Sequence, residues 1–183
     1  MEASVMRPMP AALLDQRVQV LADFYRRVQH ERMQGIALLN PALAVEAVGF
    51  EWAPSEDDGE SRPAVAEGIL VTPWFMSLVR LPAALEPHQG RVGRSRVHDF
   101  GAERFDFIGA HDPATGFHET CALFSPMADF PTQDLARETA REALALLRPA
   151  PVPAAADPRP MPARRAFFLA RGSRDGDFEG ARP

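Results

Sequence analysis

An almost continuously apolar stretch from residue 64 to residue 81 constrains the fold of this chain more than any other feature. Its 18 residues approach the length of a membrane-spanning helix, but Glu67, Pro73 and Arg80 interrupt it. Proline has no backbone N–H to donate to a sheet, so it occurs at edges, bulges and turns. The pattern therefore predicts two buried strands, divided by a bend around Pro73 and ended by Pro82.

Two other segments repeat apolar residues every three or four positions, which places those residues on one face of an α-helix. The first predicted helix spans 11–34, after Pro10 and before Gly35. Its apolar stripe consists of Leu14, Val18, Leu21, Tyr25 and Val28, and its polar side of Asp15, Arg17, Gln19, Asp23, Arg26 and Arg27. The second spans 132–148, capped by Thr132, with the stripe Leu135, Ala136, Ala140, Ala143, Leu144 and Leu147.

Further strands are indicated by alternation of apolar and polar residues. Val48, Phe50 and Trp52 alternate with smaller or polar neighbours, and segments 103–108 and 117–124 flank the turn-forming residues 111–116. These patterns predict an α+β fold with a mainly antiparallel sheet over residues 44–124, packed against the two amphipathic helices.

Composition divides the chain into three parts. Residues 11–148 hold all the predicted helices and strands and are expected to form a single domain. Residues 149–163 are mostly proline and alanine, which predicts an extended linker. The arm 164–183 begins with the apolar island Arg164–Arg171 and continues with a Gly-, Asp- and Arg-rich tail, for which partial disorder is expected.

Several classes of protein are excluded by composition. The single cysteine, Cys121, rules out an internal disulfide, a Cys-rich zinc site and an iron–sulfur site built by this chain. The net charge of -5 argues against a nucleic-acid-binding protein that works through a basic surface. No segment reaches the length of a membrane span, and Met1–Pro10 lacks the apolar core of a signal peptide. We therefore expect a cytoplasmic protein without a bound cofactor.

Signs of catalysis are weak. The sequence contains no phosphate loop, dinucleotide fingerprint, nucleophile elbow or HExxH helix. Cys121 has His118 nearby, but residues three apart on a strand point to opposite faces, so the pair fails as a nucleophile and base. One alternative stays open: a small metal- or ligand-binding enzyme domain that uses His98, His111 and His118, with acidic neighbours such as Glu119.

Aromatic and methionine residues gather in two short segments. One contains Pro73, Trp74, Phe75 and Met76, and the other contains Phe124, Ser125, Pro126 and Met127. Each residue taken singly is typical of a core. A Pro-Trp-Phe-Met sequence at a strand bend, however, is also suited to exposing an aromatic patch that binds another protein.

The same two segments resemble motifs of the HybE/HupJ/HoxT-type [NiFe]-hydrogenase assembly chaperones. The first is Gly68-Ile-Leu-Val-Thr-Pro-Trp-Phe-Met-Ser-Leu-Val-Arg-Leu-Pro82, and the second is Cys121-Ala-Leu-Phe-Ser-Pro-Met127, with Ala122 where the family often has serine. Arg164 and Arg165, followed by an apolar island, resemble the arginine pair near the family's C-terminus. The opening helix and the Leu39-Asn40-Pro41 turn come in the expected order, so the resemblance covers residues 11–171.

The resemblance implies a non-catalytic cytoplasmic protein that assists maturation of the hydrogenase small, iron–sulfur subunit. Its expected partners are the small-subunit precursor, the large subunit, and a separate rubredoxin-type protein, all engaged before twin-arginine export. Because this chain lacks two Cys-x-x-Cys pairs, iron-based electron transfer would belong to another chain. The candidate partner-binding residues are Pro73, Trp74, Phe75, Met76, Phe124, Ser125, Pro126, Arg164 and Arg165.

Overall fold

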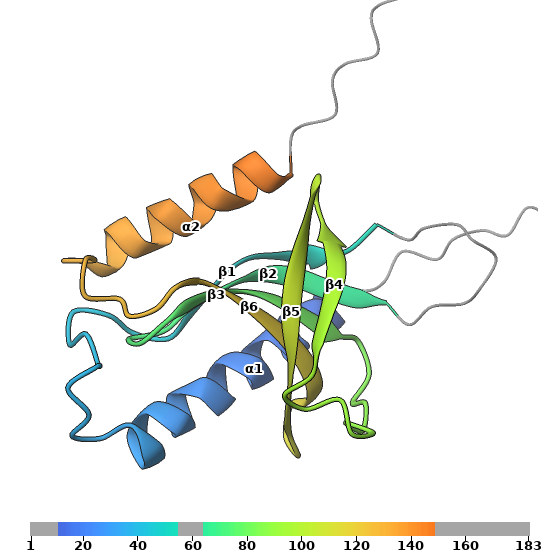
Figure 1. The fold of residues 1–183 in the computed structure, drawn as a ribbon, viewed down its shortest axis with the longest axis horizontal. Helices are drawn as coiled ribbons and strands as arrows, with labels where there is room; N and C mark the ends of the chain where they lie inside the picture. The colour runs from blue at the N-terminus through green and yellow to red at the C-terminus, as the bar shows by residue number, and fades with distance from the viewer. Residues whose placement is uncertain (1–10, 55–63, 149–183) are drawn as a thin grey trace, which may run out of the picture. The chain divides into compact units, whose positions relative to one another are not determined.

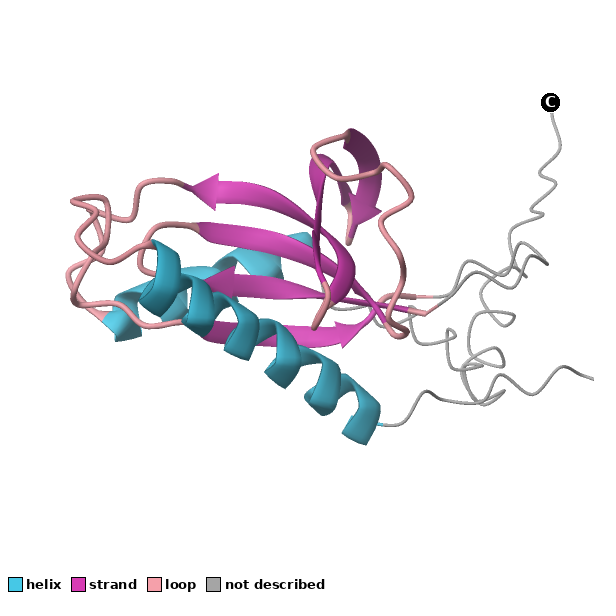
Figure 2. Ribbon diagram, turned by 90° about the horizontal axis from the view of Figure 1, so that it is seen from below, coloured by secondary structure: helices cyan, strands magenta, loops and turns pink. Residues whose placement is uncertain are grey.

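The computed structural model describes residues 11–54 and 64–148. Six strands form one sheet in the order β1-β2-β3-β6-β5-β4, and every neighbouring pair is antiparallel. The elements are α1 (Ala11–Arg32), β1 (Glu46–Trp52), β2 (Val65–Val71), β3 (Met76–Pro82), β4 (Ser95–Phe100), β5 (Glu103–Asp112), β6 (Gly116–Phe124) and α2 (Gln133–Leu147). The two helices lie on opposite faces of the sheet (Figures 1 and 2).

This arrangement confirms the predicted α+β fold with two helices and an antiparallel sheet. The apolar run forms β2 and β3, which pair from Val71↔Met76 to Val65↔Pro82 and are divided by a turn that contains Pro73. Residues 65–71 and 76–82 are buried on almost every position because the sheet is covered on both faces here. Coverage of both faces explains why the sequence is continuously apolar rather than alternating.

Strand β4 is the element that the sequence pattern does not predict. Its residues, Ser95–Phe100, are mostly exposed, and polar side chains stand on both of its faces. It is therefore held by its ladder with β5 rather than by an apolar stripe. The predicted hairpin of 103–108 with 117–124 is present as β5 and β6, whose strands extend to Asp112 and Gly116. The two strands pair only over residues 108–112 and 116–120, however, and residues 103–107 pair with β4 instead.

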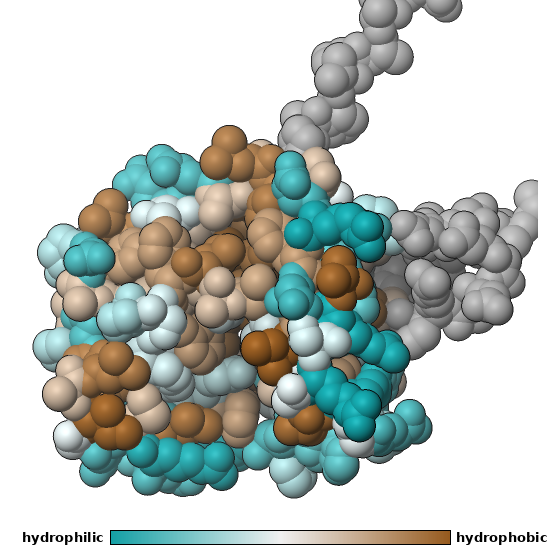
Figure 3. Space-filling model, in the orientation of Figure 1, coloured by the Kyte–Doolittle hydropathy of each residue, from teal (hydrophilic) through white to brown (hydrophobic). Residues whose placement is uncertain are grey.

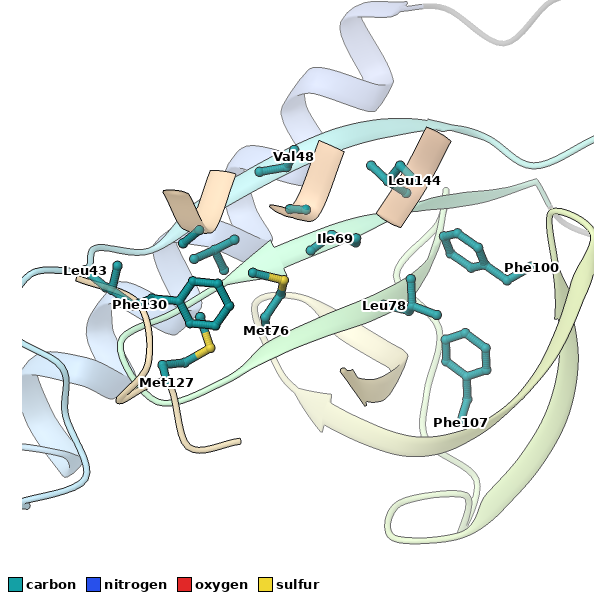
Figure 4. Close-up of a cluster of buried hydrophobic side chains, with 13 residues drawn as sticks. Leu43, Val48, Ile69, Met76, Leu78, Phe100, Phe107, Met127, Phe130 and Leu144 are labelled. Carbon is teal, nitrogen blue, oxygen red and sulfur yellow. The ribbon is translucent and has the colours of Figure 1, made fainter. Parts of the chain in front are cut away.

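Each face of the sheet has its own core. Facing α1, buried residues include Leu21, Tyr25, Leu70, Val79 and Leu81. Facing α2, the buried cluster shown in Figure 4 contains Leu43, Val48, Ile69, Val71, Met76, Leu78, Phe100, Phe107, Met127, Phe130, Ala136, Ala140 and Leu144. Thr132 caps α2 as predicted, accepting a hydrogen bond from the Leu135 N–H, but the Leu135 side chain is 43% exposed and does not join the stripe.

The far end of the sheet curls toward α2. The tip of the β4–β5 hairpin contacts the end of this helix, where Ala102 N–H donates to Leu147 O over 2.9 Å. Gly101 has a φ of 62°, and a Cβ atom there would lie 1.9 Å from Leu147 O. Only glycine therefore permits both the backbone turn and the close approach to α2.

Arg17 is predicted to lie on the polar side of the first helix, but in the structure it is buried. Its side chain is only 6% exposed. Its guanidinium donates to Pro82 O at 3.0 Å and to Thr115 O at 2.8 Å, and burial lowers its pKa. The correction has a physical reason: these two carbonyls end β3 and the β5–β6 turn, and the arginine satisfies both beneath α1.

We predict that Arg17→Met lowers the free energy of unfolding by about 2 kcal/mol, because two buried carbonyls lose their donors while the apolar stem is retained. Urea unfolding followed by circular dichroism measures this change. Arg27→Met is the matched control in the same helix, since that side chain is 54% exposed and its pair with Asp112 is 3.8 Å long. Equal stability of the two variants contradicts the role assigned to Arg17.

Candidate protein-binding surface

The turn between β2 and β3 is built around the buried hydroxyl of Thr72. Its Oγ1 accepts hydrogen bonds from the N–H groups of Trp74 at 3.3 Å and Phe75 at 2.9 Å. The Thr72 N–H donates to Phe75 O at 2.8 Å and closes the turn. A small β-branched residue with a hydroxyl thus fixes the direction in which the two aromatic side chains leave the sheet.

Trp74 and Phe75 pack against α1 and are half-buried. The ring of Phe75 meets that of Tyr25 edge-to-face at 5.5 Å, and Trp74 meets Phe75 in the same manner at 5.5 Å. Their flanking residues, Pro73 and Met76, are buried. Of the four residues in this predicted binding segment, therefore, Trp74 and Phe75 are the two with accessible surface.

The second segment lies beside the first. Phe124 pairs with Met76 across β6 and β3, and the Ser125 hydroxyl reaches Trp74 O at 3.4 Å. Phe124 is 42% exposed and stands edge-to-face on Phe130 at 5.2 Å, while Ser125 and Pro126 are exposed. We call the surface formed by Trp74, Phe75, Phe124, Ser125 and Pro126 the aromatic end. The structure thus joins two motifs that are about 50 residues apart in sequence.

Asn40 holds the aromatic end together from a loop before β1. Its backbone N–H donates to Pro73 O at 2.9 Å. Its side-chain amide donates to Met127 O at 2.9 Å and to Phe130 O at 2.7 Å, while its Oδ1 accepts from the Ala42 N–H at 2.9 Å. One residue therefore fixes the β2–β3 turn relative to the segment that follows β6.

Apolar surface continues beyond the aromatic end. Ile36 and Leu38, in the loop that leads to Asn40, are 43% and 44% exposed. Figure 3 shows brown and tan side chains across the middle of the visible face and at the edge where this loop lies. Exposed apolar residues grouped in this way are typical of a surface that binds another protein.

The histidines of the alternative hypothesis do not form one site. His98 pairs with Glu119 at 3.0 Å, whereas His118 lies on the opposite face of the sheet, beneath α1. His111 stands against His88, with ring centroids 5.0 Å apart. Among residues 11–54 and 64–148, no group of three or more His, Cys, Asp or Glu side chains is arranged to hold a metal ion.

His118 is instead part of a buried hydrogen-bond network. Its Nδ1 lies 3.3 Å from Gly116 O, which can only accept, so Nδ1 carries the proton and Nε2 accepts from the Tyr25 hydroxyl at 3.2 Å. Burial lowers the pKa of His118 to about 4 and raises that of Tyr25. Both groups are therefore neutral at physiological pH, and they link β6 to α1.

Cys121 occupies the other face from His118, as the strand alternation predicts. It packs against the core beneath α2. Burial and the negative charge of Asp106 raise the pKa of its thiol, which keeps the thiol protonated. The structure therefore assigns Cys121 a packing role in β6.

A buried ion pair joins β2 to β3 and is absent from the sequence predictions. Glu67 and Arg80 are directly opposed in the β2–β3 ladder, and Arg80 donates to the Glu67 carboxylate. Burial raises the pKa of Glu67, while Arg80 and Arg148 oppose that shift. Two opposite charges within one apolar run were the signal, because a hairpin centred on Pro73 places positions 67 and 80 opposite each other.

Two other predictions concern residues that the structure does not describe. The linker 149–163 and the arm 164–183, with Arg164 and Arg165, lie outside the described residues. Among the helices that are described, neither is long and apolar enough to cross a membrane. The limits of the predicted domain, 11–148, stay a prediction.

The fold defines a class of protein, an antiparallel sheet covered by one helix on each face, and the aromatic end is its candidate contact surface. A solved structure of HybE from Escherichia coli has the same fold, with a TM-score of 0.51 and 15% identity over 91% of each chain. At that identity the likeness concerns the fold alone.

Sequence comparison identifies the family to which the chain belongs. The model of the family "[NiFe]-hydrogenase assembly, chaperone, HybE" matches residues 16–170, and the chain belongs to that family. HoxT of Cupriavidus necator is 38% identical over 88% of this chain and 92% of its own length. A Rhodobacter capsulatus protein named "Probable rubredoxin HupJ" is 35% identical over 70% of this chain and 43% of its own length. The resemblance drawn from the two motifs is thus confirmed.

We predict that Asn40→Ala lowers the free energy of unfolding by about 2 kcal/mol, because Met127 O and Phe130 O lose a shared donor. Hydrogen exchange of the variant should also quicken selectively in residues 72–75 and 127–130. Asn40→Asp is the informative comparison: it retains the acceptor for Ala42 but loses both donated bonds, so it should be at least as destabilised. Wild-type stability in Asn40→Asp contradicts the role assigned to the Asn40 side-chain amide.

A second prediction concerns pH. Because folding lowers the pKa of His118 from 6.5 to about 4, the unfolded chain binds the proton first, and stability is lost as pH falls through this interval. The loss attributable to this group is about 3 kcal/mol. In His118→Gln the unfolding free energy should fall less between pH 7 and pH 4 than in the wild type, as measured by urea titration. Parallel pH curves for the two proteins rule the effect out.

Proposed function

We propose that this protein acts on the precursor of the hydrogenase small, iron–sulfur subunit and coordinates its assembly with the large subunit. The observation that carries this proposal is the family match over residues 16–170, which includes both segments of the aromatic end. Membership of a hydrogenase assembly family implies hydrogenase subunits as partners. The choice of the small-subunit precursor comes from the resemblance of the motifs.

The aromatic end is the surface that we assign to the client. A chaperone must present apolar surface while keeping its own fold, and here the two needs are met by different residues. Pro73 and Met76 are buried in the scaffold, whereas Phe124 is 42% exposed and Pro126 is exposed beside it. Aromatic residues with rigid support supply much contact area at little cost in side-chain entropy.

The proposed role is one of binding rather than of catalysis. In the described residues the histidines are separated and the Cys121 thiol is kept protonated, so the surface offers hydrogen bonds and apolar contact. We place the action in the cytoplasm, before twin-arginine export. A separate rubredoxin-type protein is a further proposed partner, supported by the rubredoxin name of one relative.

Substitution of the exposed aromatic residue tests the proposal. We predict that Phe124→Ser weakens binding of the purified small-subunit precursor by about tenfold or more, because an anchor residue at a contact surface is lost. Isothermal titration calorimetry measures the affinity, and thermal unfolding confirms that the variant is folded. The matched control is Leu146→Ser, which removes an 81% exposed leucine on α2 outside the aromatic end and should leave the affinity unchanged.

The double variant Trp74→Ala/Phe75→Ala extends the test to the other segment. Unchanged precursor binding in a folded double variant, together with unchanged binding in Phe124→Ser, contradicts the assignment of the aromatic end. Failure of the wild-type protein to bind the small-subunit precursor contradicts the proposed function itself.

A further inference from the structure

Strands β5 and β6 are paired over only half of their lengths. Their ladder runs from Asp112↔Gly116 to Ile108↔Thr120. Beyond this point β5 continues beside β4 alone, and β6 continues beside β3 alone. Figure 1 shows β6 bending away from β5 at this place. In the part of the chain that the structure describes, residues 121–124 of β6 therefore have no strand on their β5 side.

The alternation of the ladder shows which backbone groups face this gap. Gly109 N–H donates to Arg94 O at 3.0 Å, and Gly109 O accepts from Gly93 N–H at 2.8 Å, so Gly109 faces β4. Successive residues of an antiparallel strand face opposite neighbours, so Ile108 faces β6. Its partner Thr120 faces β5, and Ala122, two residues further, faces the same side, where β5 has left. The backbone N–H and C=O of Ala122 therefore face the gap. We call the segment Cys121–Phe124, which carries these two groups, the open edge.

Apolar side chains and one carboxylate border the open edge. Ala122 is exposed, Ile108 is 54% exposed and Phe124 is 42% exposed. In Figure 3 apolar side chains surround a hollow in the middle of the face that carries β6. Asp106, on the part of β5 that has left β6, accepts a hydrogen bond from Ser95. Burial and, to a lesser extent, the charge of Asp106 raise the pKa of the Cys121 thiol, so this carboxylate acts across the gap.

We propose that the open edge binds an extended segment of the hydrogenase small-subunit precursor as an added β-strand, with apolar residues at alternate positions and a basic residue facing Asp106. This inference rests on the proposed function and names the part of the client that is bound. The open groups are a main-chain donor and a main-chain acceptor. An extended peptide satisfies such groups, whereas a helix has already paired its own.

Charge distinguishes this occupant from a second copy of the chain. Among the described residues, no arginine or histidine forms an ion pair with Asp106. Two copies paired through their open edges would each bring an Asp106 carboxylate to the contact, and like charges across a strand pair are destabilising. A basic residue of a client would instead neutralise the Asp106 carboxylate. The open edge also continues directly into the aromatic end through Phe124.

The test uses the full-length protein and the purified small-subunit precursor. Ala122→Pro removes the N–H that faces the gap but no bond to β3, because Ala122 faces away from its ladder partner Ser77. We expect this variant to bind about tenfold more weakly than the wild type. The matched control is Ala122→Ser, which retains the N–H and should bind within about twofold of the wild type.

Two further measurements do not depend on how the proline variant folds. Hydrogen exchange of the wild-type protein should show that the Ala122 amide exchanges rapidly alone and becomes protected when the precursor is bound. Asp106→Asn should weaken binding at low salt by about threefold and have less effect at high salt. Asp99→Asn is its control on the same hairpin, since Asp99 is already paired with Arg104 at 3.4 Å, and it should leave binding unchanged.

The outcomes separate this inference from the proposed function. If the precursor binds the wild type but the Ala122 amide stays unprotected and Ala122→Pro binds equally well, the open edge is not the binding site and the proposed function stands. If sedimentation shows a dimer that Ala122→Pro abolishes, a second copy occupies the edge and the inference is wrong. If the precursor fails to bind the wild type at all, both proposals are overturned.

Discussion

Burial of β2 and β3 on both faces is the constraint from which the rest of the structure follows. A strand pair that is apolar at most positions on both faces needs a cover on each side, and α1 and α2 supply the two covers. The same burial explains why Glu67 and Arg80 stand opposite each other. An isolated charge in that position would be costly, so each neutralises its partner within the ladder. A shifted register would separate the two charges and leave each buried without its partner, so the pair favours the observed register of the central hairpin.

The aromatic end depends on this scaffold through few residues. Thr72 sets the turn, and Asn40 connects the turn with the segment after β6 by bonds to three carbonyls. Tyr25 then supports Phe75 from α1 and is itself held by the neutral His118. A rigid, hydrogen-bonded base of this kind allows Trp74 and Phe124 to remain partly exposed without rearrangement. For the proposed partner this surface is already formed, and a preformed surface lowers the entropic cost of binding.

The sequence was sufficient for the features that depend on local patterns. The apolar run with Pro73 predicted β2, β3 and their turn, and Thr72–Met76 with Cys121–Met127 identified the family. Strand β4 was not predictable, because its ladder with β5 rather than an apolar stripe holds it in the sheet. Arg17 was assigned to the wrong side of α1 for a related reason: its two acceptors, Pro82 O and Thr115 O, come from distant parts of the chain.

The divergence of β5 from β6 connects the fold to the proposed activity. The hairpin β4–β5 leaves β6 beyond Ile108 and reaches the end of α2, and Gly101 permits that contact. The same curvature uncovers Ala122 next to Phe124, so the exposed backbone lies beside the exposed aromatic surface. Unpaired strand edges promote aggregation, and proteins usually keep them short or place charges beside them. Here the edge is four residues long and faces Asp106, which limits unspecific pairing while leaving room for a strand of complementary charge.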